Sequence, residues 1–480
     1  MLTSRQVLER RPAHVRPLAV TALRHPTVST LLADHRSLLA DLMDGLGSPL
    51  HVVLPEIFEE NVRRLRTAFA EAGAPVDILF AKKANKADCY VGSAAALGIG
   101  VDVASTPELV KALAGGVPGH RIGVSGPEKD DALHALAVRH GCLVAVDSIS
   151  ELRRLAATAR LARRQATVLL RCRTNAQPGS RFGMSAAERE AAVGLCAELG
   201  AHIALRGFSF HLNGYCAAER ATAANEMIEH CVDARRRGSP AAELVDIGGG
   251  LPVRYVDPRV WEEFLRDNGP AHYHAAKDFK SFYAYGGPTA AQTARAIMEH
   301  PVAGGQSLSA KARRNGIRFI VEPGRALLDQ AGLTLYRVQQ VDDRRDTDGY
   351  AIVTVAGSSF SLSEQWFNSD YLPDPLLLPA DAEAHTQTHA HAHAHAHAHA
   401  GEVFPACVAG STCLESDLVT WRKIGFPQPV RRGDQLAYLN TAGYQMDSNE
   451  SPFHDAALPL KAVIRLDDAS GRPRWRLDGI

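Results

Sequence analysis

The sequence has no excess charge of either sign: among its 480 residues, 53 lysines and arginines balance 53 aspartates and glutamates. A protein without a basic surplus has no general field that attracts nucleic acid or acidic lipid, so we expect neither as a partner. The sequence also lacks an apolar run long enough to span a bilayer. The segment from Met1 to Val20 carries four arginines and no continuous apolar core, unlike a secretory signal. We therefore expect a soluble, cytoplasmic protein.

Paired cysteines are missing as well. Eight cysteines are scattered without a Cys-x-x-Cys pair, which argues against a zinc ribbon or a disulfide framework. Histidine, by contrast, is concentrated, because seven of the 21 histidines lie at His385 and in the His-Ala repeats from His389 to Ala400. Such a tract either collects metal ions or is an unselected repeat on an exposed loop. We favour the second interpretation, with incidental weak binding of nickel or zinc, and expect no defined metal site.

Alternating strand and helix patterns dominate the chain from residue 50 to residue 322. Roughly eight strand-helix units in about 280 residues fit a closed (β/α)8 barrel of α/β class better than an open sheet. After Ala331 the pattern changes to strands separated by Gly, Pro and Asp, as in an antiparallel β domain. We predict an N-terminal segment (1–48) that packs on the β domain, a barrel (49–332), and a C-terminal β domain (333–480) with a disordered His-Ala tract at 385–400.

The most unusual stretch runs from Val76 to Asn85, where an apolar strand ends in Lys82 and Lys83. Side chains alternate between the faces of a strand, so only one of the two lysines can point into a site. A lysine desolvated at a strand end loses part of its preference for the charged form, and a neutral amine can form a Schiff base with an aldehyde. Alternatively, both lysines extend their ammonium groups into solvent and close an ordinary strand.

Reactive side chains follow other predicted strands, as they do at the carboxyl-terminal face of a catalytic barrel. Consecutive glycines let backbone N–H groups approach an anion, and an arginine offers the paired donors that phosphate oxygens accept. A salt bridge in a turn is the alternative for Glu322 and Arg325, and a packed core histidine is the alternative for His211. The strand-end positions are Asp102, Arg171, His211, Gly248, Gly249, Gly250, Glu322, Gly324 and Arg325.

Eight short motifs occur in order along the chain. They are FAKKAN (80–85), GVDVASTPEL (100–109), SRFG (180–183), HLNG (211–214), VDIGGG (245–250), EPGR (322–325), CLESD (413–417) and AGY (442–444). This series resembles the motifs of the fold-type III pyridoxal phosphate-dependent decarboxylases, the family of diaminopimelate and ornithine decarboxylases. The resemblance covers the chain from about residue 50 to about residue 460, and the shared order of eight motifs makes it specific.

The resemblance implies a barrel followed by a β domain, pyridoxal 5′-phosphate as cofactor, and a homodimer with active sites shared across the interface. It implies that Lys83 forms the Schiff base, that His211 stacks on the cofactor ring and that Glu322 faces the pyridine nitrogen. Lys82 stands where the family usually has an apolar residue. Cys413, supplied by the partner subunit, would donate a proton. The resemblance also assigns the phosphate to Gly248, Gly249, Gly250, Gly324, Arg325 and Tyr444, and polar positions near the ring and Schiff base to Asp102 and Arg171.

These roles agree with the chemistry of decarboxylation. A carboxylate at the pyridine nitrogen keeps that nitrogen protonated, so the ring accepts the electron pair released when the bond to the α-carboxylate breaks. The α-carbon is then protonated, for which Cys413 is the candidate, and the products are an amine and carbon dioxide. Racemases of this fold type resemble the same site but have an arginine at the position of Glu322. Glu322 therefore favours decarboxylation.

Two departures from the family pattern bear on the substrate. Leu414 follows Cys413 at a position where decarboxylases of diamino acids usually have an acid. A buried ammonium without a counter-charge is costly, so ornithine or lysine lacks a partner unless Glu415 or Asp417 replaces that acid. The Arg-Pro-x-Leu-Tyr segment typical of diaminopimelate decarboxylases is also absent, and residues 359–370 take its place.

A long irregular stretch from Pro252 to Asn315 either encloses a larger anionic ligand or is a surface excursion. We hypothesise a decarboxylase of a conjugated or polycarboxylate amino acid, such as citryl-diaminopropionate in siderophore biosynthesis. The alternatives are a diaminopimelate decarboxylase of lysine biosynthesis, another diamino acid decarboxylase, and a non-catalytic pyridoxal phosphate-binding protein. Proteins of the last class lack a β domain and the Cys413 region. The polar and aromatic residues of the stretch are His272, Tyr273, His274, Lys277, Lys280, Tyr283 and Tyr285.

Overall fold

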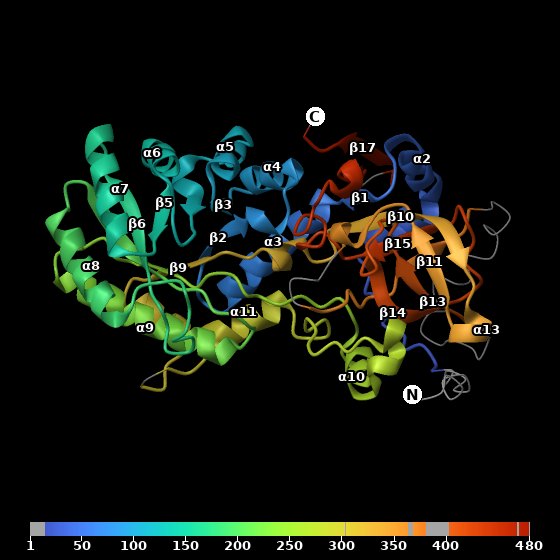
Figure 1. Cartoon of the computed structure of the whole chain (residues 1–480). Coiled ribbons are helices and arrows are strands. Elements are labelled where there is room, and N and C mark those ends of the chain that lie inside the picture. The colour runs from blue at the N-terminus through green and yellow to red at the C-terminus, as the bar shows by residue number, and fades with distance from the viewer. Residues whose placement is uncertain (1–14, 303, 363–367, 381–402, 468–469, 480) are drawn as a thin grey trace, which may run out of the picture.

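The chain folds into a barrel and a separate sheet that lie side by side (Figure 1). The computed structural model describes residues 15–302, 304–362, 368–380, 403–467 and 470–479. The predicted His-Ala tract at 385–400 lies outside these ranges. None of the helices within them is long and apolar enough to cross a membrane.

Eight parallel strands close the barrel in sequence order, which confirms the predicted barrel. Each strand is short and apolar because both of its faces are buried. Leu79, Leu169, Leu244 and Ile320 form a small cluster of their own, apart from the large core between strands and helices, as expected for a layer inside a barrel. The strands are β2 (Val76–Ala81), β3 (Gly100–Val103), β4 (Ile122–Val124), β5 (Leu143–Val146), β6 (Ala166–Arg171), β7 (Ile203–Ser209), β8 (Leu244–Asp246) and β9 (Arg318–Val321).

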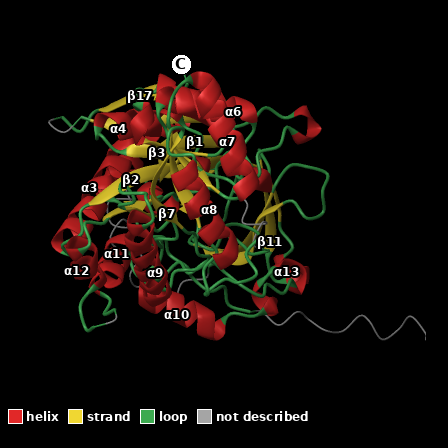
Figure 2. Cartoon of the chain, turned by 90° about the vertical axis from the view of Figure 1, so that its left-hand side faces the viewer, coloured by secondary structure: helices red, strands yellow, loops and turns green. Residues whose placement is uncertain are grey.

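Helices surround the barrel strands (Figure 2). Many begin with a capping side chain; Ser148, for example, accepts a hydrogen bond from the Glu151 backbone. The last large helix, α11, packs against both α9 and α3 and so closes the ring. The helices from residue 55 to residue 314 are α3 (Pro55–Glu71), α4 (Asp88–Ala96), α5 (Thr106–Ala114), α6 (Asp131–His140), α7 (Ile149–Ala162), α8 (Ala186–Glu198), α9 (Ala217–Arg236), α10 (Pro258–Asp267), α11 (Ala290–Glu299) and α12 (Leu308–Arg314).

The second part is a nine-stranded, mostly antiparallel sheet, as predicted for the β domain. Two of its pairs are parallel, β1 with β16 and β11 with β13. A short helix, α13 (Arg345–Asp348), joins β10 to β11. The strands are β1 (Leu50–Val53), β10 (Gly332–Asp342), β11 (Ala351–Val355), β12 (Leu376–Leu378), β13 (Phe404–Ala409), β14 (Leu418–Phe426), β15 (Gln435–Leu439), β16 (Leu460–Leu466) and β17 (Pro473–Leu477).

The strand at the start of the predicted barrel segment (49–332) lies in this second sheet instead. Leu50 pairs with Leu335 of β10 on one side and with Leu460 of β16 on the other. The barrel segment is thus inserted between β1 and β10. The N-terminal segment contains two helices, α1 (Pro26–Asp34) and α2 (Arg36–Leu46), and Arg36 and Asp44 contact the second part through Pro379 and Arg337.

The irregular stretch after Pro252 is largely part of the second core. Tyr255, Trp261 and Tyr285 are buried there together with residues of β10, β11 and β15. Tyr273 forms an isolated bridge with Arg422 of β14, and His274 hydrogen-bonds Tyr350 at 2.9 Å. The segment therefore joins barrel and sheet, rather than forming a free surface excursion.

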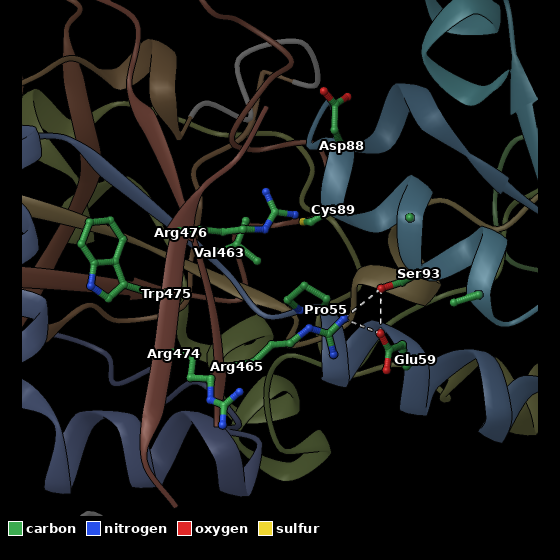
Figure 3. A pocket seen from close by; sticks show the side chains of 12 residues that line it. Pro55, Glu59, Asp88, Cys89, Ser93, Val463, Arg465, Arg474, Trp475 and Arg476 are labelled. Atoms are coloured by element: carbon green, nitrogen blue, oxygen red, sulfur yellow. Dashed lines mark hydrogen bonds and ion pairs between the residues drawn. The ribbon is translucent and has the colours of Figure 1, made fainter. Parts of the chain in front are cut away.

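A second junction brings the end of the chain onto α4. Figure 3 shows Arg465 directed at Glu59 and Ser93, with Arg476 pointing towards Cys89 across a cavity of about 370 Å³. Beside it, the Asp478 carboxylate accepts hydrogen bonds from the backbone N–H groups of Asp88 and Cys89 at 2.7 and 2.9 Å. The negative charge of Asp478 interacts favourably with the positive, N-terminal end of the α4 dipole. The residue that follows β17 of the second sheet therefore stabilises the start of α4.

Candidate active site

The sequence-predicted residues of the barrel meet at the carboxyl ends of its strands. Ala81, which precedes the two lysines, pairs with Asp102 of β3, and Ser209 of β7 pairs with Asp246 of β8. Parallel strands bring their carboxyl ends to one rim, so residues distant in the sequence become neighbours. Within the described part of the chain, this rim carries the ion pair between Lys83 and Asp102 and the carboxyl pair of Asp246 and Glu322.

Lys82 and Lys83 point in different directions. The Lys83 Nζ lies 3.0 Å from Asp102 Oδ2, and 46% of its side chain is accessible. Lys82 is 2% exposed, and its Nζ donates a hydrogen bond to the Lys86 carbonyl at 3.1 Å. Lys83 is therefore the lysine that enters the rim cluster.

The pKa of Lys83 shifts in the direction opposite to that expected from desolvation alone. Asp102 raises the pKa of Lys83 well above its usual range, burial opposes this shift, and Glu322 adds to it. Burial instead lowers the pKa of Lys82, because its nearest carboxylate, Asp88, is 3.9 Å away. A close counter-charge outweighs desolvation at Lys83, and Asp102 lies near the proposed Schiff-base position as the resemblance implies.

The segment that carries Lys83 is held by the second part of the molecule. Asn85 Nδ2 donates to the Ala442 carbonyl at 2.8 Å, and the Tyr444 backbone N–H donates to the Ala84 carbonyl at 2.8 Å. The Asp447 carboxylate accepts from the Lys86 backbone N–H at 2.6 Å. These contacts fix the short 3₁₀ turn η1 (Lys82–Ala84), which no sequence pattern indicated.

Two buried acids, Asp246 and Glu322, share the ends of β8 and β9. Burial raises the pKa of Asp246 to about 6, although a hydrogen bond with Glu322 lowers it. Burial raises the pKa of Glu322 well above its usual range, and the charges of Asp102 and Asp246 add to this effect. Both acids therefore hold their protons to higher pH than exposed carboxyl groups do. Asp246 is a strand-end residue in the sequence, but its role depends on this pairing, which the sequence did not show.

His211 borders the three glycines. A Cβ at Gly248 would lie 2.8 Å from His211 Nδ1, and one at Gly249 would lie 3.5 Å from Cε1 of the same ring. Burial lowers the pKa of His211 to about 3, and the positive charges of Lys83, Arg220 and Arg171 act in the same direction. The imidazole is therefore neutral at physiological pH, and the packed-core alternative is wrong because its side chain is exposed at the rim.

Arg220 of α9 packs against the glycine turn and hydrogen-bonds to nearby backbone carbonyls. No sequence pattern indicated this residue. It is 1% exposed and donates to the Ile247 carbonyl at 2.8 Å and to the Gly214 carbonyl at 3.3 Å. A Cβ at Gly250 would lie 2.3 Å from its Nη2. Gly248 and Gly250 have φ values of +68° and +72°, a backbone conformation that favours glycine, and the Gly248 N–H donates to Asp246 Oδ1 at 2.8 Å.

Arg171 lies at the end of β6, away from the glycines. Its Nη1 is 3.4 Å from Asp147 Oδ1, and its guanidinium carbon lies 4.6 Å from the centre of the Phe182 ring. The Asp147 carboxylate also accepts from the Gly183 backbone N–H at 3.0 Å. Asp147 thus links Arg171 to the SRFG motif, a connection that the sequence did not reveal.

Gly324, Arg325 and Tyr444 form one packed group. The guanidinium carbon of Arg325 lies 4.5 Å from the Tyr283 ring centre and 5.0 Å from the Tyr444 ring centre. A Cβ at Gly324 would come within 2.8 Å of the Tyr444 hydroxyl and of Ala84 Cβ. Of the irregular stretch after Pro252, Tyr283 is the residue that we trace to this group.

Cys413 does not join the rim cluster within one chain. It lies on the loop between β13 and β14, where its Sγ is 3.1 Å from His454 Nε2. We find no contact between Cys413 and the barrel residues in the part of the chain that the structure describes.

The rim fits a flat, phosphorylated aldehyde. Gly249, Gly250, Gly324 and Arg325 would present N–H and guanidinium donors to a phosphate, and Lys83 offers an amine. The Gly248 N–H is donated to Asp246 Oδ1 at 2.8 Å. Among the described residues, the buried Asp102 Oδ1 and Ser209 Oγ have no hydrogen-bond partner. The aldehyde and phosphate of pyridoxal phosphate match these groups.

Comparison with known proteins identifies the family. Residues 57–277 match the family model of the pyridoxal-dependent decarboxylases, pyridoxal binding domain. The uncharacterized protein y4yA of Sinorhizobium fredii is 35% identical over 453 residues, which cover 94% of each chain. Diaminopimelate decarboxylase of Bacillus subtilis is 26% identical over 453 residues, covering 89% of this chain and 88% of its own.

Solved structures share the fold. Diaminopimelate decarboxylase of Helicobacter pylori, crystallised with L-lysine, superposes with a TM-score of 0.67 at 17% identity and covers 92% of this chain and 97% of its own. Lysine/ornithine decarboxylase of Vibrio vulnificus, crystallised with putrescine, gives 0.65 at 20% identity and covers 89% and 98%. With the family model and the full-length relatives, this architecture means that the chain belongs to the fold-type III pyridoxal phosphate-dependent decarboxylases and is an amino acid carboxy-lyase with pyridoxal 5′-phosphate as its cofactor.

Proposed function

We propose that this enzyme removes the α-carboxylate of a conjugated or polycarboxylate amino acid, such as citryl-diaminopropionate in siderophore biosynthesis. The observation that carries the proposal is that the loop bearing Cys413 has no free acid at the positions of Leu414 and Asp417. Leu414 is 39% exposed there, and the Asp417 carboxylate is occupied by the Thr412 hydroxyl at 2.7 Å and the Ser359 backbone N–H at 2.7 Å. Asp417 therefore has a structural role and is a poor clamp for a distal ammonium. Of the two acids considered as substitutes, Glu415 alone is left.

In this proposal, Lys83 would offer its amine to the cofactor aldehyde, and Asp102 holds that amine at the rim. Glu322, hydrogen-bonded to Asp246, would bind the pyridine nitrogen, and neutral His211 would contact the ring. Arg171 is fixed by Asp147 near the ring. The phosphate is bound by Gly248, Gly249, Gly250, Gly324, Arg325 and Tyr444.

Bound pyridoxal phosphate supplies the electron sink for cleavage of the bond between the α-carbon and its carboxylate. The residues of the chain orient the reacting groups and deliver the proton. Arg325 would hold the phosphate end of the cofactor and Glu322 its pyridine nitrogen, while Lys83 would hold the aldehyde until the substrate amine takes its place; the α-carbon would then be kept in one orientation. A proton must then reach the α-carbon, and we assign it to the Cys413 thiol of a second copy of this chain, since Cys413 has no contact with the described rim residues of its own. The enzyme would thus act as a homodimer, in the cytoplasm.

Carbon dioxide release from a substrate panel tests the proposal. Purified enzyme with pyridoxal phosphate should release carbon dioxide from citryl-diaminopropionate, with kcat/KM at least about tenfold above that for diaminopimelate, ornithine and lysine, since an unpaired ammonium should be rejected. Release from free diaminopimelate in preference to the conjugate would contradict the siderophore assignment and leave the decarboxylase assignment intact.

A second candidate substrate is diaminopimelate itself. The relatives with assigned activities that align over most of the chain are diaminopimelate decarboxylases, among them those of Bacillus subtilis and Corynebacterium efficiens. Under this alternative, Glu415 would take the role of the missing acid. A Glu415→Gln variant should then lose diaminopimelate decarboxylation, whereas under the first proposal it should retain activity on the conjugate.

A further inference from the structure

A thiol and an imidazole, those of Cys413 and His454, meet at the surface of the second sheet. The Cys413 Sγ and His454 Nε2 are 3.1 Å apart, and both residues are exposed. Cys413 and Cys216 are the exposed cysteines of the chain, whereas the other six are buried. An accessible thiol in contact with an imidazole is the arrangement that exchanges protons most readily near neutral pH.

Both partners are held in place by their own segments. On the thiol side, the Asp417 carboxylate accepts hydrogen bonds from the Thr412 backbone N–H at 3.1 Å and its hydroxyl at 2.7 Å, which fixes the turn before Cys413. On the imidazole side, His454 has a φ of +62°, and its ring stacks on Phe453 at 4.4 Å between centres. Phe453 in turn meets Phe360 edge to face at 6.3 Å. A residue held in a left-handed conformation and stacked has a fixed ring orientation.

We propose that His454 is a positioning residue that holds the proton of the Cys413 thiol and replaces it after each turnover. This inference rests on the proposed function of Cys413 as the proton donor. The Sγ–H bond breaks as the substrate α-carbon–H bond forms, and the thiolate then takes the proton of the His454 imidazolium. The imidazole recovers a proton from solvent, which its exposure permits. Each cycle therefore consumes one proton from water, as decarboxylation requires.

The segment that carries His454 also connects the Cys413–His454 pair to the cofactor side of the molecule. The segment begins at Tyr444, whose hydroxyl borders Gly324. A turn follows, in which the Ser448 backbone N–H and hydroxyl both donate to the Tyr444 carbonyl, at 2.9 and 2.7 Å. The titratable groups beside the pair are Glu415 and Asp417 on the thiol loop and Asp455 next to His454. Asp417 is occupied by Thr412 and Ser359, which leaves His454 as the group in contact with the thiol.

Alkylation of Cys413 tests the pairing without substrate or cofactor. In a Cys216→Ser background, iodoacetamide should modify Cys413, and the rate should depend on pH with two inflections in the cofactor-free protein. A His454→Gln variant should react about tenfold more slowly near pH 7, with a single inflection near the ordinary cysteine value of about 8.5. His120, an exposed histidine on the barrel, provides the matched control His120→Gln, whose profile should equal that of the parent.

Kinetics of the holoenzyme test the catalytic use of the pair. His454→Gln should lower kcat about 10- to 100-fold with little change in KM, a range typical of a lost proton-transfer partner. Superposable alkylation profiles for parent and variant would overturn the proposal, as would an altered profile with unchanged kcat. If the parent releases no carbon dioxide from any amino acid while the alkylation profiles differ as expected, the proposed function fails and the thiol–imidazole pairing stands.

Discussion

The carboxyl groups of Asp246 and Glu322 hydrogen-bond to each other at the ends of two adjacent barrel strands. Two buried acids in contact cannot both ionise at low cost, so one keeps its proton. Burial raises the pKa of both groups, and the charges of Asp102 and Asp246 raise that of Glu322 further. The site therefore stores a proton at the place where the family positions an acid against the cofactor ring.

The Asp246–Glu322 pair should make the cofactor-free protein less stable as the pH rises. Because the pKa of Asp246 is raised to about 6, the native state binds more protons than the unfolded chain between about pH 4 and pH 6, so its contribution to stability falls as the pH rises through that window. Asp246→Asn removes the buried charge. Urea unfolding should show the variant gaining stability relative to the parent as the pH rises from about 4 to about 6, with no further gain above that window. Glu198→Gln, on the exposed face of α8, should give no such trend.

The two adjacent lysines should respond in opposite ways to substitution. Lys83→Ala removes the amine at the rim and should lower kcat at least about 10³-fold and abolish the yellow colour of the holoenzyme. Lys82→Met replaces a buried ammonium by an apolar chain of similar length and should keep activity within a few-fold, with equal or greater stability. Borohydride reduction followed by peptide mapping provides the measurement. Modification at Lys82 would overturn the assignment.

Gly324 should tolerate no side chain. In Gly324→Ala the new methyl group would meet the Tyr444 hydroxyl and Ala84 at 2.8 Å, displacing the residues that we assign to the phosphate. We expect the affinity for pyridoxal phosphate to fall at least about tenfold, a loss of about 1.4 kcal/mol, measured by fluorescence titration. Gly194→Ala is the matched control, because no atom lies within 4 Å of that position in α8. It should leave the affinity unchanged and stabilise the helix slightly.

Asp447 should contribute both to the free energy of unfolding and to the position of the segment that carries Lys83. Its carboxylate is 2% exposed and lies 2.5 Å from Lys461 Nζ, and it also accepts from the Lys86 backbone. Asp447→Asn leaves a buried ammonium unpaired and should lower the free energy of unfolding by about 3 kcal/mol at pH 7.

The pH dependence of this variant has a defined sign. Burial opposes ionisation of Asp447, yet Lys461 lowers its pKa overall, so the stabilisation it provides is present above about pH 4 and is lost at lower pH. The difference between variant and parent should shrink accordingly in acid urea denaturation. Asp278→Asn, which breaks the exposed pair with Lys280, should cost under about 1 kcal/mol at any pH.

Local sequence patterns predicted the barrel and most of its rim because both depend on short-range signals. Apolar strands followed by glycine, acid or lysine identify strand ends, and barrel closure then brings those ends together without further information. Asp102, His211 and Glu322 were found in this way. Arg220 and the pairing of Asp246 with Glu322 were missed, since they depend on neighbours from other strands and helices that no local pattern specifies.

The second sheet was harder to predict. β13 and β14 follow the His-Ala tract and alternate weakly, and β17 carries three exposed residues, Arg474, Trp475 and Arg476. β1 reads as an apolar strand just before a helix, which is also the pattern of a barrel strand. Its partners, Leu335 and Leu460, lie hundreds of residues later, so only the folded chain shows which sheet it joins.

The central position of β1 has a consequence for biosynthesis. A ribosome releases β1 hundreds of residues before its parallel neighbour β16. If the barrel between them folds first, β1 has one edge with unpaired backbone groups, which can pair wrongly until β16 arrives. Removal of β16 would leave that edge open in the folded protein as well.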